Sequence, residues 1–179
     1  MTTYYASGAL WGTASHWGTT SGASDGAVPG SGDDVIFDGT SVSMAINATA
    51  VCASLTSTGY TGKTLTQNAS QTLTVSGDIA WAAGTFTGGD STVLCKTYSL
   101  TGGAWTSTSG SFEIGSPSFL QGHGTTITPL LTSGSFTFTH NSGTFKLNCQ
   151  GTGTNTRNIS IASAITFNNF TFTGGSGYA

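Results

Sequence analysis

The chain has 179 residues, enough for one substantial domain and too few to make two domains the expectation. Only 6% of the residues are charged and the net charge is −3, which excludes the positive electrostatic footprint of a nucleic-acid-binding protein. The 27 glycines and the many serines and threonines take the place of charged residues, while 36% hydrophobic and 11% aromatic content predicts a buried core rather than a disordered chain.

The first 26 residues are predicted to form an N-terminal cap or attachment segment of a single domain, with residues 27–179 forming the rest. Trp11 and Trp17 are expected to cover the N-terminal end of the core. The opening residues contain no basic region followed by an apolar one, and no apolar run approaches the ~20 residues of a membrane span. We therefore expect no export signal within this sequence and no membrane insertion.

Residues 27–39 then predict a turn, a short strand over 35–37 and a second turn. Proline fixes φ, glycine permits the left-handed backbone of a tight reversal, and aspartate side chains accept hydrogen bonds from nearby backbone amides. The residues expected to shape these turns structurally are Pro29, Gly30, Gly32, Asp33, Asp34 and Asp38.

Short units that alternate apolar and hydroxyl-bearing residues recur along the rest of the chain. Alternation with a period of two predicts strands with one buried and one solvated face. No window of a dozen residues keeps helical spacing, so we expect little or no helix. The units are residues 42–46, 64–66, 72–75, 84–87, 110–114, 134–139, 143–147 and 170–173.

The predicted fold class is all-β, and two architectures compete. A parallel β-solenoid (β-helix) accepts short strands and turns of uneven length, and it would stack the phenylalanines of the second half into a ladder. A β-sandwich or jelly roll, with turns every ~8–12 residues, stays open as the alternative. The open end of a solenoid has to be covered, so we expect the chain or its assembly to continue past Ala179.

Three residues are candidates for surface recognition. Residues 115–124 interrupt the alternation and predict a protruding loop that carries Phe119 and His123, and Tyr60 lies in a glycine-rich turn. Aromatic rings stack on sugars and on protein partners. A host surface glycan is therefore a candidate ligand. Trp81 and Trp105 alternate with small residues and are expected in the core.

The acidic residues argue against catalysis. Glycoside cleavage needs two carboxyl groups facing each other at roughly 5–10 Å. Glu113 is the only glutamate, and Asp78 and Asp90 are the only aspartates after the opening turns. No G-x-S-x-G elbow or phosphate-binding loop is present. We therefore predict that the chain is not an enzyme.

Metal and cofactor sites are not expected either. The three cysteines, Cys52, Cys95 and Cys149, and the three histidines are scattered, with no CxxC or HxxxH pair. Buried free cysteines are the favoured interpretation, and one disulfide stays open. Calcium at the opening aspartates is a lesser alternative, because the EF-hand spacing is absent.

Thr-x-Thr triplets are a further recurrent feature. A flat array of paired threonines on a solenoid could bind ice, but the uneven gaps between the triplets predict that their threonines do not align. Threonine is also a favoured outward residue on a half-buried strand, and we interpret the triplets in that way. The triplets begin at residues 64, 72, 85, 126, 137 and 171.

The opening of the chain resembles the first coil of right-handed β-solenoid domains, in which a tryptophan precedes a Pro-Gly-Asp turn and a strand begins the helix. The matching residues are Trp11, Trp17, the segment 29–39 and the alternating stretch 42–46. Similar Gly/Ser/Thr-rich chains occur in tailed-phage virion proteins and in bacterial surface adhesins.

This resemblance implies a structural or adhesive, non-catalytic component of a phage virion, such as a tail fibre, capsid fibre or decoration protein. Its partners would be other virion proteins or copies of itself, including a homotrimer. A bacterial cell-surface adhesin or a carbohydrate-binding module is the alternative. A glycan-depolymerising tailspike is a third, although such enzymes carry clustered carboxylates that this chain has few residues to supply.

Overall fold

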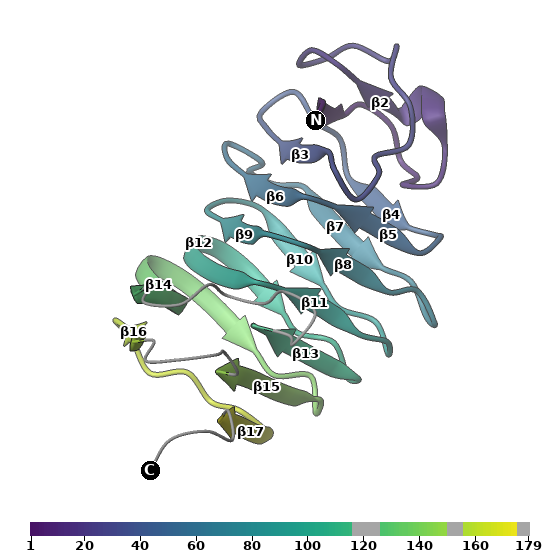
Figure 1. The fold of residues 1–179 in the computed structure, drawn as a ribbon. Helices are drawn as coiled ribbons and strands as arrows, with labels where there is room; N and C mark the ends of the chain where they lie inside the picture. Colours follow the sequence, from purple (N-terminus) through teal and green to yellow (C-terminus); the bar gives the residue numbers. More distant parts are fainter. Residues whose placement is uncertain (116–125, 150–155, 175–179) are drawn as a thin grey trace.

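The computed structural model describes residues 1–115, 126–149 and 156–174. Within these ranges it describes every side chain except those of residues 126, 127, 149, 156, 157 and 174. Within these ranges the chain is built from strands, and its one helical element is a single 3₁₀ turn, η1 (Ala14–His16) (Figure 1). The all-β prediction is confirmed. The strands follow one another from β1 and β2 at one end of the molecule to β16 and β17 at the other (Figure 1).

In the described part of the chain, the larger of two sheets has eleven strands and is mixed, because β1 pairs antiparallel with β2 and parallel with β3. Every other described pair is parallel. Its strands are β1 (Thr3–Ala6), β2 (Trp17–Gly18), β3 (Asp34–Phe37), β4 (Met44–Ile46), β6 (Ser54–Ser57), β7 (Thr64–Gln67), β9 (Asp78–Trp81), β10 (Thr85–Thr87), β12 (Thr97–Thr106), β14 (Thr126–Thr139) and β16 (Thr156–Ile161).

The smaller sheet has six parallel strands in the order β17-β15-β13-β11-β8-β5. Sequence alternation located some of these strands and missed others, such as β11, in which leucine and not a hydroxyl-bearing residue faces outward. The strands are β5 (Ala50–Cys52), β8 (Leu73–Val75), β11 (Val93–Cys95), β13 (Ser111–Ile114), β15 (Thr144–Cys149) and β17 (Asn169–Gly174).

Two long strands bend the larger sheet. The first part of β12 pairs with β9 and its last part with β10, and the register shifts between Leu100 and Gly102 where β12 meets β14. Gly103 (φ 70°) and Gly134 (φ 74°) have a backbone conformation that side chains disfavour. A Cβ on Gly103 would lie 2.4 Å from the Gly84 carbonyl oxygen, so both the backbone conformation and the space require glycine here.

The core is a continuous column of in-register side chains between the sheets. Trp81 and Trp105 are fully buried, as predicted, and the Trp105 ring stacks on Phe86 with 3.9 Å between ring centroids. The predicted phenylalanine ladder is confirmed in the smaller sheet, where Phe112, Phe145 and Phe170 stand opposite one another on β13, β15 and β17.

Candidate functional site

The opening turns are held by two of the three predicted aspartates. Asp33 accepts hydrogen bonds from the backbone N–H groups of Gly30 (3.1 Å) and Thr2 (2.9 Å), which lower the pKa of its carboxyl. Asp38 accepts hydrogen bonds from the backbone N–H groups of Thr40 and Ser41, both at 2.9 Å. Their predicted role as turn residues is confirmed.

The electrostatics of Asp38 follow from its neighbours. Partial burial raises its pKa, but hydrogen bonds from the Ser21 and Thr40 hydroxyls and from the backbone of Ser41 and Thr40 outweigh burial and lower the pKa to about 2. Asp38 is therefore ionised at neutral pH and is engaged by its own loop and by Ser21. It has the character of a structural carboxylate.

Asp34 and Gly32 differ from their predicted roles. Asp34 belongs to strand β3, where its carboxylate accepts a hydrogen bond from the Ser54 hydroxyl on β6 instead of capping a turn. Neither Gly30 nor Gly32 has a positive φ, and a Cβ on Gly32 would meet nothing within 4 Å. The reversal is thus made without left-handed glycine, while Pro29 lies buried beneath it.

The predicted N-terminal cover is confirmed for Trp11 and Trp17. Both are fully buried, their rings make an edge contact with 4.8 Å between centroids, and each ring also packs near Phe37. The Trp17 indole Nε1–H donates to the Trp11 carbonyl oxygen (2.7 Å). The two side chains therefore belong to the core and are closed to ligands.

The prediction that Tyr60 is a surface recognition residue is wrong. Its side chain is fully buried between Phe37 and Trp81, and its hydroxyl lies 2.9 Å from the carbonyl oxygens of Val42 and Thr64, which share its single donor hydrogen. Burial also raises the pKa of the hydroxyl. The glycine-rich turn carries the backbone outward while the ring points into the core. Phe119 and His123 lie outside the described residues.

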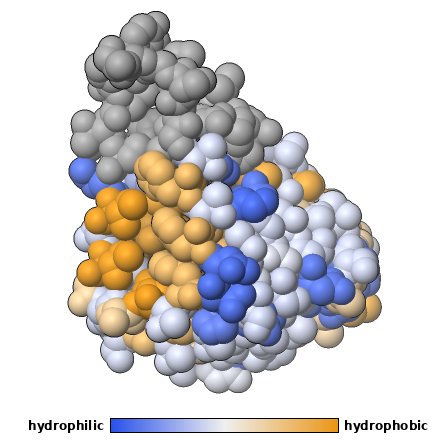
Figure 2. All heavy atoms as spheres, turned by 90° about the horizontal axis from the view of Figure 1, so that it is seen from below, coloured by the Kyte–Doolittle hydropathy of each residue, from blue (hydrophilic) through white to orange (hydrophobic). Residues whose placement is uncertain are grey.

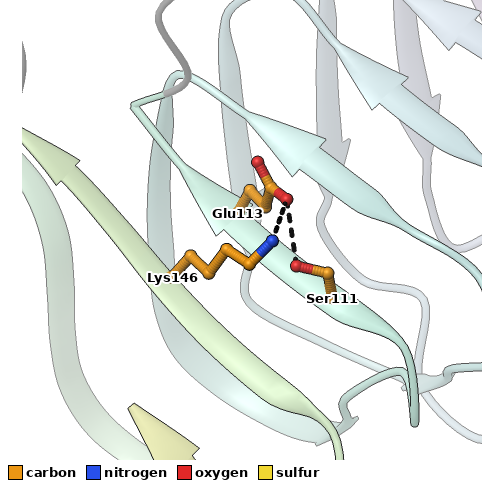
Figure 3. Close-up of polar contacts among 3 residues, drawn as sticks. All are labelled: Ser111, Glu113 and Lys146. Carbon is orange, nitrogen blue, oxygen red and sulfur yellow. Dashed lines mark hydrogen bonds and ion pairs between the residues drawn. The ribbon is translucent and has the colours of Figure 1, made fainter. Parts of the chain in front are cut away.

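Glu113, the only glutamate, is paired with a cation and not with a second acid. It stands opposite Lys146 on β15, and its Oε1 accepts hydrogen bonds from the Lys146 ammonium (2.8 Å) and the Ser111 hydroxyl (3.0 Å) (Figure 3). The three side chains lie on the outer face of the smaller sheet. This arrangement is a half-buried cross-strand ion pair at the surface of the sheet, which contributes about 1 kcal/mol or less to stability.

One file of polar residues on the larger sheet brings two acids onto the same face. Asp34 on β3 is opposite Ser54 on β6, and Asp78 on β9 is opposite Thr97 on β12. Each carboxylate accepts a hydrogen bond from the hydroxyl group of the residue opposite it, with 2.6 Å between Thr97 Oγ1 and Asp78 Oδ1. Sequence reasoning missed this file because its members are paired only through strand register.

The cysteines and the metal-binding groups offer no centre in the described part of the chain. Cys52 and Cys95 are buried free thiols, and burial raises the pKa of each. The described residues contain no group of three His, Cys, Asp or Glu side chains that could hold a metal ion.

An apolar surface lies on the last strands, and we call it the C-terminal end surface. It consists of Ile159 and Ile161 on β16 and Phe170 and Phe172 on β17, which are 42–56% exposed. Seen from below, apolar side chains gather in one continuous patch at this end (Figure 2). Sequence reasoning placed a strand at 170–173 but did not predict that its phenylalanines are exposed.

Strand register explains why these side chains are apolar. The residues opposite them one strand earlier, Leu130, Thr132, Phe145 and Leu147, are all buried. Among the described residues, β16 pairs only with β14 and β17 only with β15. The core columns therefore run onto the C-terminal end surface, and no described strand pairs with the outer edges of β16 and β17.

The comparisons with known proteins give no relative: no family model, no curated protein and no solved structure matches the chain. No helix in the described ranges is long and apolar enough to cross a membrane.

Proposed function

We propose that the chain is a parallel β-solenoid that serves as a structural and adhesive, non-catalytic module of a phage virion appendage. The parallel registers support the solenoid, because strands of three columns recur in rotation: β3, β4 and β5 are followed in their columns by β6, β7 and β8, and then by β9, β10 and β11. A β-sandwich of the immunoglobulin type is built from antiparallel sheets.

The observation that carries the assembly role is the C-terminal end surface. Its four apolar side chains continue buried core columns, and the burial of each half-exposed side chain would contribute about 1 kcal/mol to an association. The outer edges of β16 and β17, with which no described strand pairs, would add backbone hydrogen bonds to a docked strand. A partner of the same assembly, or another copy of the chain, would supply that strand.

Three features support a mechanical and not a catalytic role. The carboxylates hold turns, bond to hydroxyls of neighbouring strands or pair with Lys146, and no third acid joins Asp34 and Asp78 on their file. Few charged groups are present to titrate, so the stack should keep its shape over a wide range of salt and pH. The resemblance of the opening segment to the first coil of phage solenoids supports the virion setting.

The experiment introduces Phe172→Asp into the phage that encodes the chain, with Thr171→Asp as the matched control. Thr171 is exposed on the outer face of the same strand, so the control places the same charge one residue away from the C-terminal end surface. We expect purified virions to contain the wild-type chain and the Thr171→Asp chain, and to lack the Phe172→Asp chain.

Two outcomes would contradict the proposal. Absence of the wild-type chain from purified virions, with antibody labelling on phage-free bacterial cells, would favour the surface adhesin. Release of oligosaccharides from host polysaccharide by the purified chain, with loss of release in Glu113→Gln or Asp78→Asn, would favour the tailspike enzyme.

A further inference from the structure

Threonines from four separate strands align on one face of the larger sheet, which we call the threonine face. Strand register places Ala45, Thr66, Thr87, Thr106 and Thr139 in one file across β4, β7, β10, β12 and β14. A second file contains Thr64, Thr85, Ala104 and Thr137. The prediction that uneven gaps keep the triplets out of alignment is therefore wrong for these strands, because the loops between them absorb the differences in length.

The hydroxyl groups of this face are directed outward. Side chains on the same strands at the intervening positions, Leu65, Phe86 and Trp105, are fully buried, so their threonine neighbours point away from the core. Thr137 and Thr139 are exposed and the other five threonines are half-buried. None of the seven hydroxyls has a hydrogen-bond partner among the described residues.

The composition of the face differs from that of the other outer faces. If threonine were merely a favoured outward residue, it would be equally common on every face. The outward file of the smaller sheet instead reads Val51, Thr74, Leu94, Glu113, Lys146 and Thr171, with two charges and two large apolar side chains. Among the described residues, neither file of the threonine face carries a charged side chain, and the one large apolar side chain is Leu10, which bridges Ala45 at the edge of the first file.

Backbone geometry makes the face a regular two-dimensional lattice. Neighbouring parallel strands lie about 4.8 Å apart, and residues i and i+2 along a strand are about 6.6 Å apart. Threonine is branched at Cβ and has few side-chain rotamers, so its hydroxyl and methyl groups are held in nearly fixed positions. The spacing between strands is close to one repeat of the water oxygens in hexagonal ice.

We propose that the threonine face binds ice. The methyl groups and hydroxyls would together order a layer of water whose spacing matches the crystal, and the absence of charge leaves that layer undisturbed. A sugar ligand fits this face less well, because sugar rings stack on exposed aromatic side chains, whereas Phe86 and Trp105 under the files are fully buried and Phe138 is half-buried against the core. The inference does not depend on the proposed assembly role, which concerns β16 and β17.

The test compares the purified wild-type chain with Thr87→Tyr, at the centre of the face, and with Thr74→Tyr, an outward and half-buried position on the smaller sheet. Two readouts are the gap between melting and growth temperatures of a single ice crystal and the fraction of protein incorporated into a growing ice hemisphere. We expect wild type and Thr74→Tyr to show the gap and to enter the ice, and Thr87→Tyr to lose most of both.

Circular dichroism of the three chains establishes that each is folded. A fourth variant, Thr87→Val, keeps the shape of the side chain while removing its hydroxyl. Exclusion of the wild-type chain from ice, or equal behaviour of Thr87→Tyr and Thr74→Tyr, would overturn the proposal. It would also be overturned if wild type binds insoluble cellulose or chitin in a Thr87-dependent way without affecting ice.

Discussion

The hydroxyls of Tyr60 and Tyr98 allow a matched test of how the core is held together. Both rings are buried, but the Tyr60 hydroxyl lies 2.9 Å from two backbone carbonyl oxygens, whereas the Tyr98 hydroxyl has no hydrogen-bond partner in the described structure. Replacement by phenylalanine keeps each ring and removes only the hydroxyl. The two substitutions therefore isolate the hydrogen bond from the packing.

We expect Tyr60→Phe to lower the free energy of unfolding by about 1–3 kcal/mol, because it leaves the Val42 and Thr64 carbonyls without this donor. Tyr98→Phe removes an unpaired buried polar group and should leave stability unchanged or raise it by up to about 1 kcal/mol. Urea unfolding followed by tryptophan fluorescence measures both, with an unchanged m-value as the check that the unfolded states are comparable. Equal losses in the two variants, or a larger loss in Tyr98→Phe, would refute the reasoning.

Three further predictions concern backbone, charge and thiols. Gly103→Ala should destabilise the fold because of its φ of 70° and the nearby Gly84 carbonyl, whereas Gly32→Ala should be neutral or stabilising by up to about 1 kcal/mol; thermal melts compare them. The pKa of Asp38 is lower in the folded chain than in the unfolded one, so its contribution is present above about pH 4 and is lost as the pH falls towards 2. After solvent screening, this contribution to the free energy of unfolding is about 1 kcal/mol. Asp38→Asn should remove the contribution at pH 7 and make the acid unfolding curve less steep between about pH 4 and 2. In a Cys149→Ser chain, Cys52 and Cys95 should react with a thiol reagent only after denaturant is added, and rapid reaction of the native chain would contradict their burial.

Sequence periodicity predicted those strands whose outward positions carry hydroxyls. Thr64–Gln67 and Thr85–Thr87 are examples, because the apolar residue between two threonines marks the buried face. Strands such as Ala50–Cys52 and Ser54–Ser57 escaped prediction. Their inward positions include alanine, cysteine and serine, which do not stand out as core residues, and Ser57 is fully buried.

The surfaces proposed for function could not be predicted because they are set by contacts distant in sequence. The exposure of Phe172 depends on what stands beside β17, and the alignment of Thr87 with Thr66 and Thr106 depends on the loops between their strands. The prediction that Tyr60 is a surface residue was wrong for a related reason. A glycine-rich turn indicates exposure of the backbone, but it does not show that the ring folds inward onto Phe37.

Electron cryomicroscopy of the native assembly is the most direct test of the central claim that the C-terminal end surface is the attachment site. We predict that partner polypeptide lies beside the outer edges of β16 and β17, with which no described strand pairs, and covers Ile159, Ile161, Phe170 and Phe172. A map in which these four side chains face solvent, with the chain attached through another surface, would contradict it.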